Sequence, residues 1–442
     1  MNTKKYRLSL FNNFIYKNNT LFIINEFYGS FLKCSEENLD CVKSIIFQKK
    51  ELYDETSYIF NKLIKKNIIV PSVRDEINMF RYERNSILYS NRTLFITIIP
   101  TLSCNFRCLY CYESNSLKII SESTLENLKL YILKNIKRYH SVMINWFGGE
   151  PLLCLDVIIS FMEQINKICK KECIPVISQM TTNGYYLTQD VFLKLYNQKI
   201  LYYQVSLDGI SPVQNQYRPS KDGTDSYSKV LQNLKDIKNT KKKNFQIGIR
   251  SNISVHSYRK VRMLIDILAE SFREDKRYVY LVCKICDWGG KRVSSFDDAL
   301  FTEEDFLSVE DELLQYAAEK GLNIEQAGYK YRGEGICDYL KNSAFILNAD
   351  GLLYPCTLAI DNPYYSIGEI NQKGEMILND KFYDWVPTYH TEDECLKCEH
   401  IASCLGVPCP FHYKIEGNRK CKKRNISYFN DTFFSTTEWD LI

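Results

Sequence analysis

Thr101-Leu-Ser-Cys104-Asn-Phe-Arg-Cys108-Leu-Tyr-Cys111-Tyr112 places three thiols at C-x3-C-x2-C spacing, directly after the apolar run Leu94 to Pro100. Such a run predicts a strand, so the thiols are expected on a loop at its carboxyl end. Three thiolates can hold three irons of a 4Fe-4S cluster and leave the fourth iron open, whereas a structural zinc or iron-sulfur site usually takes four protein ligands. The stretch therefore predicts a cluster with one iron left for a chelating cofactor.

Composition limits the possible classes of protein. The chain has 442 residues, enough for two or three domains, and its formal charge of +4 is small for that length. We expect no nucleic-acid partner, because Lys and Arg are nearly balanced by Asp and Glu. No apolar run is long enough to cross a membrane, and the first residues lack the apolar core of a signal peptide, so a cytoplasmic protein is expected. In that compartment the 17 cysteines favour metal sites over disulfides.

Residues 1–92 are predicted to form a small domain of their own. Apolar residues on both sides of the turn Lys17-Asn18-Asn19 indicate a short antiparallel sheet, and two helical patterns follow at 35–48 and 55–66. A three-stranded sheet with helices on one side is a winged-helix-like plan. Such a domain either packs as a cap on its neighbour or captures an extended peptide at an open sheet edge by strand addition.

From residue 93 to about residue 300, strand-like and helical patterns alternate. Six such units predict a parallel sheet, which either curls into part of a barrel or stays open. In both plans the chemistry collects at the carboxyl ends of the strands. The expected strands span 94–100, 142–147, 174–181, 200–206, 245–253 and 277–285.

Glycine-rich and polar motifs follow several of these strands. In Gly148-Gly149-Glu150-Pro151 two glycines allow the backbone to approach a ligand closely, and the proline suits the start of a helix. The third strand ends in Thr181-Thr-Asn183-Gly, the fourth in Ser206-Leu-Asp208-Gly, and the fifth contains Arg250-Ser-Asn. Arg218 follows the fourth strand, and its guanidinium is suited to bind a carboxylate.

A second cysteine array occupies the last third of the chain. Its members are Cys337, Cys356, Cys395, Cys398, Cys404, Cys409 and Cys421. Four of them, from Cys395 to Cys409, could form a zinc ribbon, but that interpretation leaves the other three unexplained.

The first loop and the strand-end motifs, in this order, resemble the radical S-adenosylmethionine (SAM) superfamily. The resemblance implies that Cys104, Cys108 and Cys111 hold a 4Fe-4S cluster, that SAM chelates its open iron, and that reductive cleavage of SAM gives a 5'-deoxyadenosyl radical. It implies that the Gly-Gly-Glu-Pro segment holds the SAM amino group. The full implied set of SAM contacts is Tyr110, Gly148, Gly149, Glu150, Pro151, Asn183, Ser206, Asp208, Arg218 and Arg250. The His-Asp pair usual in the family is Gln214-Asn215 here, so the resemblance implies no role for that pair.

The second array resembles the SPASM domain, which binds two auxiliary 4Fe-4S clusters in radical SAM enzymes. By this resemblance Cys395, Cys398, Cys404 and Cys421 hold the distal cluster, and Cys337, Cys356 and Cys409 hold the proximal one. The proximal set has three members. Its fourth iron is either open to a substrate thiolate or completed by another residue, such as Cys283 or Cys286.

Together the resemblances imply an α/β protein with a partial (β/α)6 TIM barrel at 93–300, a winged-helix-like precursor-recognition domain at 1–92 and a SPASM domain at 301–442. The implied activity is thioether crosslinking of a cysteine-containing ribosomal precursor peptide, with electrons from a flavodoxin- or ferredoxin-type donor. Carbon-carbon crosslinking, epimerisation and formylglycine formation by a sulfatase maturase are the nearest alternatives. The maturases carry an aspartate where this chain has Thr357. A non-enzymatic iron-sulfur electron carrier is the alternative from another class.

Overall fold

The computed structural model describes residues 5–47, 52–53, 57–289, 292–293, 300–324, 337–385, 393–398, 400–407, 409, 411, 433–434 and 437–442. The chain divides into two compact units, which are described separately. The smaller comprises Met1–Ser90, Gly328–Lys341 and Pro387–Ile442, and the larger comprises Asn91–Ala327 and Asn342–Val386. None of the helices in the described ranges combines the length and hydrophobicity needed to cross a membrane.

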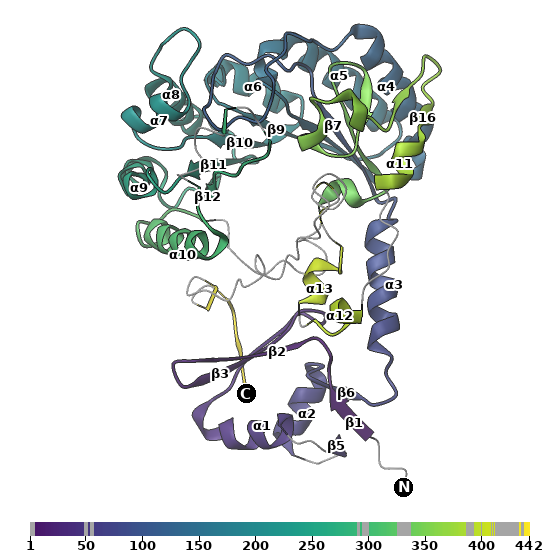
Figure 1. Ribbon diagram of the computed structural model, residues 1–442, viewed down its shortest axis with the longest axis vertical. Coiled ribbons are helices and arrows are strands. Elements are labelled where there is room, and N and C mark those ends of the chain that lie inside the picture. The colour runs from purple at the N-terminus through teal and green to yellow at the C-terminus, as the bar shows by residue number, and fades with distance from the viewer. Residues whose placement is uncertain are drawn as a thin grey trace. The chain divides into compact units, whose positions relative to one another are not determined.

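The larger unit is built on a curved parallel sheet (Figure 1). All six predicted strands are present, and each pairs in parallel with the next along the chain. They are β7 (Thr93–Ile98), β8 (Ser141–Trp146), β9 (Val176–Thr182), β10 (Ile200–Ser206), β11 (Gln246–Ile253) and β12 (Tyr278–Lys284). Sequential order in a parallel sheet is the arrangement of a barrel and places all carboxyl ends on one rim.

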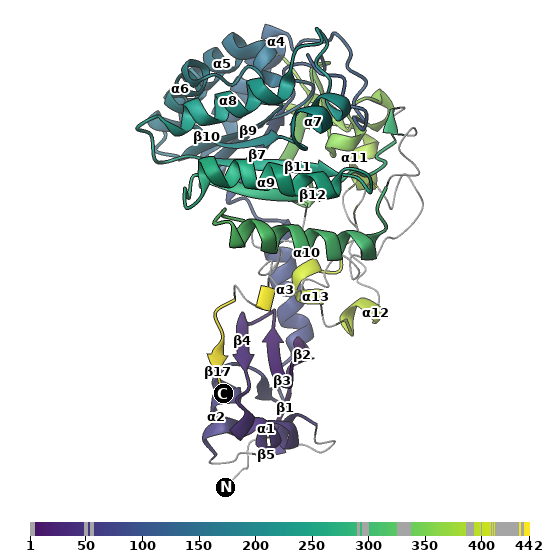
Figure 2. The same cartoon turned by 90° about the vertical axis from the view of Figure 1, so that its left-hand side faces the viewer.

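Helices connect these strands on the outer side of the sheet (Figure 2). They are α4 (Glu122–Asn135), α5 (Leu155–Lys171), α6 (Gln189–Asn197), α7 (Ser211–Tyr217), α8 (Ser226–Lys238), α9 (Tyr258–Phe272) and α10 (Glu303–Glu319), with the short 3-10 turns Ile136–Arg138 and Pro151–Cys154. Polar side chains fix where several of them begin: Ser121, Thr188 and Thr302 each accept a hydrogen bond from a main-chain NH of the first turn.

Four further strands extend the sheet beyond β7. The first, β13 (Ala344–Leu347), runs parallel to β7, and β14 (Leu352–Tyr354), β15 (Gly368–Ile370) and β16 (Met376–Leu378) follow antiparallel. The 3-10 turns Thr357–Ala359 and Pro363–Tyr365 and α11 (Asp380–Trp385) complete this part. The sequence patterns did not predict that residues 342–386 share a sheet with the first barrel strand. The borders 92/93 and 300/301 along the sequence stay a prediction.

The smaller unit contains the predicted N-terminal sheet region, but its strands form two sheets. The hairpin of β2 (Asn12–Lys17) and β3 (Thr20–Asn25) turns at Asn18 and Asn19, whose φ angles of 48° and 59° suit a tight hairpin turn. The remaining elements are β1 (Lys5–Leu8), β4 (Ser30–Lys33), β5 (Leu52–Tyr53), β6 (Ile69–Pro71), β17 (Asp440–Leu441), the 3-10 turns Glu36–Asn38 and Asp338–Leu340, α1 (Leu39–Ile46), α2 (Tyr58–Lys65), α3 (Glu76–Leu88), α12 (Asp393–Leu396) and α13 (Ile401–Cys404). The sheets are β5-β1-β6 and β17-β4-β3-β2.

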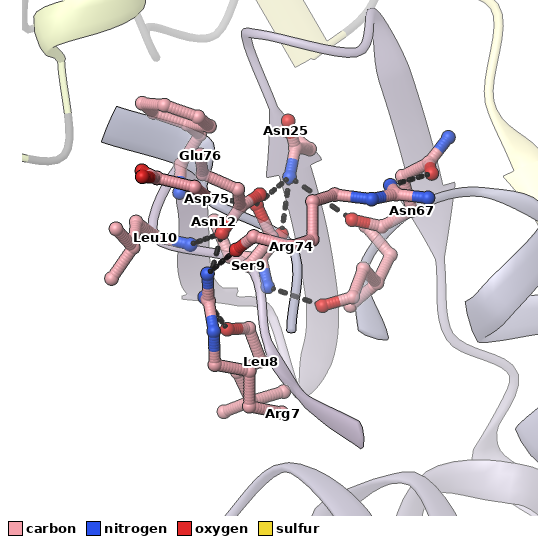
Figure 3. A network of polar contacts seen from close by, with 12 residues as sticks. Arg7, Leu8, Ser9, Leu10, Asn12, Asn25, Asn67, Arg74, Asp75 and Glu76 are labelled. Atoms are coloured by element: carbon pink, nitrogen blue, oxygen red, sulfur yellow. Dashed lines mark hydrogen bonds and ion pairs between the residues drawn. The ribbon is translucent and has the colours of Figure 1, made fainter. Parts of the chain in front are cut away.

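A buried polar network joins α3 to the first strands of this unit (Figure 3). The Glu76 carboxylate, 1% exposed, accepts hydrogen bonds from Arg7 (2.7 Å), from the Ser9 hydroxyl (2.7 Å) and from the Leu10 main-chain NH (3.0 Å). Asn25 donates to Ser9 and so brings β3 into the same network. A buried carboxylate is tolerated when its oxygens are satisfied in this way.

Candidate active site

The three-cysteine loop leaves β7 and lies directly against the turn that follows β8. A Cβ atom on Gly149 would be 2.2 Å from the Ser103 carbonyl oxygen, and one on Gly148 would be 2.7 Å from that of Thr101. Gly148 also has a φ of 109°, a conformation that other residues rarely adopt. The Glu150 main-chain NH donates to the Ser103 carbonyl at 2.9 Å. Both glycines are therefore explained by close contact with the cysteine loop.

A second set of contacts holds the other side of the loop. Phe106 forms an antiparallel bridge with Ser220, the Arg107 NH donates to the Pro219 carbonyl (2.8 Å) and the Leu109 NH donates to that of Tyr217 (2.9 Å). The segment after α7 thus borders the loop like a short strand.

Three residues from separate sequence motifs meet at the Tyr110 hydroxyl. Its hydroxyl donates to the Asp208 carboxylate and accepts from the Arg218 guanidinium and from the Asn252 amide. The Asp208 and Arg218 side chains are almost fully buried, and Arg218 also lies 3.9 Å from Asp208. The Arg218 Nε has no hydrogen-bond partner among the described residues. A buried guanidinium with an unused donor, next to the thiol loop, fits the carboxylate of a ligand such as SAM.

Asn252 contacts both Tyr110 and Asp208, although the sequence motifs do not single it out. Arg250, the predicted member of the same Arg-Ser-Asn motif, donates through its Nε to the Asn252 side-chain oxygen at 2.9 Å. Ser206, 9% exposed, ends the neighbouring strand β10 in register with Arg250. The motif Arg250-Ser-Asn in the sequence could have indicated this residue. Its position on the strand decides that Asn252 is the member that faces Tyr110.

The Glu150 side chain makes its hydrogen bonds within the protein. It is fully buried, and its two oxygens accept hydrogen bonds from the Thr182 hydroxyl (2.7 Å) and from the NH groups of Asn183 (2.8 Å) and Leu152 (3.0 Å). Its carboxylate therefore ties the end of β8 to the end of β9. Pro151 begins the following 3-10 turn, as predicted from its fixed φ.

The thiols themselves form a suitable donor set for an iron-sulfur cluster. Burial raises the pKa of Cys104 and that of Cys111 to about 12 and also raises the pKa of Cys108. Buried thiols ionise when a bound metal supplies the positive charge, so the site favours metal ligation over free thiolates. Asn183 donates to Cys104 Sγ at 3.9 Å and to the Asn105 side chain at 2.7 Å. In the described residues no three His, Cys, Asp or Glu side chains are close enough to share a single metal ion.

The end of the loop contacts the segment that follows Cys356. Ser114 donates to the Asp361 carboxylate through its main-chain NH (2.7 Å) and its hydroxyl (2.6 Å), and the Tyr112 hydroxyl is hydrogen-bonded to Thr357. Burial, together with the nearby carboxylates, raises the pKa of Glu113 to about 8. The loop and Cys356 thus belong to one part of the larger unit.

The other predicted cysteines of the second array belong to the smaller unit. Cys395 and Cys398 pack on a buried apolar cluster of the smaller unit, and Cys404 accepts a hydrogen bond from the Gly406 NH at 3.3 Å. Cys337 and Cys409 also belong to that unit. Cys421 lies outside the described residues.

The Gln214-Asn215 pair has structural roles. The Gln214 side-chain oxygen accepts from the Asp208 NH at 2.8 Å, and Asn215 accepts from the Ser226 NH at 2.9 Å, which joins α7 to α8. Gln214 thereby helps to position the main chain of Asp208.

Residues 98–266 match the model of the radical SAM superfamily. The chain carries a radical SAM enzyme domain. The matched range contains the three-cysteine loop, the Gly-Gly-Glu-Pro turn, Asp208, Arg218 and Asn252. A radical SAM domain implies a 4Fe-4S cluster and SAM as cofactors. The buried thiols described above fit the cluster, and the Arg218 guanidinium fits the SAM carboxylate.

Two curated enzymes are similar in sequence to parts of this chain. Fe-coproporphyrin III synthase of Methanosarcina barkeri is 23% identical over 171 residues, which is 38% of this chain and 39% of the relative. The cysteine-type anaerobic sulfatase-maturating enzyme of Clostridium novyi is 22% identical over 338 residues, which is 71% of this chain and 87% of the relative. The chain thus spans about two fifths of the first relative and most of the second.

Solved structures share the fold of this chain. The sulfatase-maturating enzyme anSMEcpe with bound AdoMet and a Cp18Cys peptide is 19% identical, with a TM-score of 0.59 over 77% of this chain and 96% of that chain. Streptococcus suis SuiB bound to precursor peptide SuiA is 13% identical, with a TM-score of 0.52 over 90% of this chain and 94% of that chain. The likeness confirms the predicted α/β partial barrel with an added N-terminal sheet region and a C-terminal cysteine-rich region.

Proposed function

We propose that the chain is a SPASM-type peptide maturase that forms thioether crosslinks in a cysteine-containing ribosomal precursor. The observation that carries this proposal is the contact between the first cysteine loop and the segment after Cys356, made by Ser114 and Asp361. A cysteine of the second array therefore belongs beside the loop that starts the reaction. The relatives that bind or mature peptides support the choice of a peptide as substrate.

Different residues of the barrel rim would bind the cluster and SAM. Cys104, Cys108 and Cys111 would hold the first cluster, and the Arg218 guanidinium would bind the SAM carboxylate. The Tyr110 hydroxyl contacts that guanidinium directly. Asn252 acts on it through Asp208, whose carboxylate it holds in place. Bound together, the cluster and SAM supply a carbon radical oxidant that takes a hydrogen atom from the substrate.

The remaining predicted SAM contacts form two groups. Gly148 and Gly149 bring the backbone close to the loop, and Glu150 and Pro151 hold that turn in place. Asn183, Ser206 and Arg250 stand on neighbouring strand ends. The side chain of Glu150 is engaged with β9, so we expect the SAM amino group to meet main-chain oxygens of this turn instead.

Each crosslink removes one hydrogen atom, one proton and one electron from the peptide. A carbon of the peptide loses a hydrogen atom, a cysteine sulfur loses a proton, one electron leaves to an iron-sulfur acceptor, and a carbon-sulfur bond forms. The acceptor would be an auxiliary cluster. We assign Cys337, Cys356 and Cys409 to the proximal cluster and Cys395, Cys398, Cys404 and Cys421 to the distal one. A flavodoxin- or ferredoxin-type protein is the proposed electron donor.

The experiment combines two readouts on the reconstituted enzyme. With reductant, SAM and a candidate cysteine-bearing precursor, we expect 5'-deoxyadenosine and a peptide lighter by two hydrogens per link. Cys356→Ala should keep 5'-deoxyadenosine formation and lose the crosslinked peptide, whereas Cys41→Ala, an exposed thiol outside both arrays, should behave as wild type. Absence of 5'-deoxyadenosine with reductant and peptide present contradicts the enzymatic proposal.

Formylglycine formation is the second candidate, because the sulfatase-maturating relative aligns over 71% of this chain. The residue after Cys356 is Thr357, and its side chain is hydrogen-bonded to Tyr112. A hydroxyl in that position is a much weaker base than a carboxylate. Loss of the sulfur atom from the peptide, seen by mass spectrometry, would favour this candidate over a thioether.

A further inference from the structure

The β4 edge of the second sheet in the smaller unit is occupied by a segment from far along the chain. Residues 437–442, here called the edge segment, contain β17, which pairs in parallel with β4 (Figure 2). The Ser35 NH donates to the Ile442 carbonyl at 2.7 Å, and the Ile442 NH donates to the Lys33 carbonyl at 3.0 Å. This is the hydrogen-bonding pattern of strand addition, the way in which sheet edges bind extended peptides.

Side chains of the edge segment reach both faces of this sheet. Ile442, 4% exposed, packs with Leu32 on the face that carries the main core. Trp439 packs on the opposite face, where its ring centroid is 4.6 Å from that of Phe22 and 6.1 Å from that of Phe31. An aromatic residue and an aliphatic residue three positions later therefore act as anchors.

Two lysines of α2 and its end border the same edge. Lys66 is paired with the Asp440 carboxylate, and Lys62 donates to the Leu441 carbonyl oxygen. Both contacts are exposed, so they contribute little to stability, yet they favour an acidic strand over a basic one.

We infer that the β4 edge is a docking site for an extended acidic peptide, and that the edge segment occupies this site until such a peptide displaces it. The partner carries an aromatic residue, an acidic residue next to it and an aliphatic residue two positions further on, as in Trp439-Asp-Leu-Ile442. Its identification as the leader of the precursor rests on the proposed function. The presence of a displaceable strand does not.

Asp440→Lys is the variant that weakens the edge segment without touching the core. The Asp440 side chain is 49% exposed, and the new charge would face Lys66. Glu438→Lys makes the same charge change two residues away, at another exposed position, and serves as the matched control. The probe is a fluorescein-labelled synthetic peptide with the sequence of residues 433–442, and its binding to the full chain without SAM is followed by fluorescence anisotropy.

We expect the Asp440→Lys chain to bind the probe at least several-fold more tightly than either the wild type or the Glu438→Lys chain. A second substitution, Ser35→Pro, should then reduce binding tenfold or more, because it removes the NH that faces the edge. Ser35 has a φ of −70°, which proline adopts without strain, so the fold should survive. A probe with lysine in place of its aspartate should bind less tightly than the acidic probe.

Two results would overturn the inference. One is equal probe binding by the wild-type and Asp440→Lys chains while hydrogen exchange shows residues 440–442 still protected in both, which would make the edge segment a fixed strand. The other is binding that Ser35→Pro leaves unchanged. Since SAM cleavage is measured separately, a failure here is distinguishable from a failure of the proposed enzymatic activity.

Discussion

Asn252 donates twice to the same carboxylate oxygen of Asp208, through its main-chain NH and through its side-chain amide, each at 3.0 Å. Asp208 follows β10, which ends at Ser206, and Asn252 lies near the end of the neighbouring strand β11. Because one oxygen of Asp208 is fully engaged with Asn252, the other faces Tyr110 and Arg218. The position of the buried guanidinium thus depends on an amide that is not one of its direct neighbours.

Asn252→Ala should therefore weaken SAM binding while the cluster still assembles. Removing the amide leaves buried acceptors on Asp208 and Tyr110 less satisfied, at a cost of about 1–3 kcal/mol, so we expect roughly a tenfold or greater loss of SAM affinity. Equilibrium dialysis with SAM and iron analysis measure the two effects. Asn135→Ala, on the outer helix α4, is the control. Loss of iron together with loss of SAM binding would show that Asn252 supports the fold instead.

Gly149→Ala should prevent assembly of the first cluster. The new Cβ would lie 2.2 Å from the Ser103 oxygen, so the cysteine loop must move. We expect the iron content to fall by one cluster after reconstitution and 5'-deoxyadenosine formation to disappear. Gly289→Ala introduces a methyl group into open space at a φ of 86°, with an expected cost of about 1 kcal/mol and no loss of iron. Full iron content in Gly149→Ala would contradict the close approach of loop and turn.

Glu76→Gln should loosen the first strands of the smaller unit. The amide cannot accept from Arg7, Ser9 and Leu10 as the carboxylate does, and we expect a loss of about 1–3 kcal/mol. Hydrogen exchange of residues 5–10 is the suitable measurement, because two units need not unfold together. Glu37→Gln, at an exposed position, should leave exchange unchanged. Unchanged exchange in Glu76→Gln would show that the network of Figure 3 is not stabilising.

The Asp275–Arg277 ion pair predicts a pH-dependent contribution to stability. Burial opposes ionisation of Asp275, but hydrogen bonds from Arg277 outweigh it and lower the pKa of that carboxyl below 3.8. A lowered pKa in the folded state gives stability that is present above the unfolded value and is lost as the pH falls through the folded one. Arg277→Gln should therefore lower the melting temperature at pH 7, and the difference from wild type should shrink toward about pH 3.

Lys276→Gln is the matched control for this pair. It removes the same charge from the same turn, at an exposed side chain, and should change the melting temperature little at either pH. Arg277 also donates to the main-chain oxygens of Lys238 and Lys242, and these hydrogen bonds do not depend on the charge of Asp275. Equal effects of Arg277→Gln at both pH values would therefore assign the stability to those bonds and contradict the ion pair as the cause.

The sequence predicted the barrel strands well because each is a local apolar run followed by a motif. It also predicted the cysteine loop and most residues of the Tyr110 network, since strand-end positions converge in any parallel sheet. It could not predict the pairing of β13 with β7 or of β17 with β4, because these strands are short and their partners lie hundreds of residues away. The engagement of Glu150 with Thr182 and Asn183 was missed for a related reason: a motif gives the position of a carboxylate but not its hydrogen bonds.

The pairing of β13 with β7 has a consequence for how this protein can be divided. The strand that carries the first cysteine loop has neighbours on both sides, β8 and β13, and one of them comes from the chain after residue 340. A fragment that stops near residue 300 would expose the edge of β7 and the apolar side chains that pack there. Chimeras that exchange the C-terminal cysteine region with that of a relative therefore need their junction after residue 386, so that β7 keeps the strands that extend the sheet beside it.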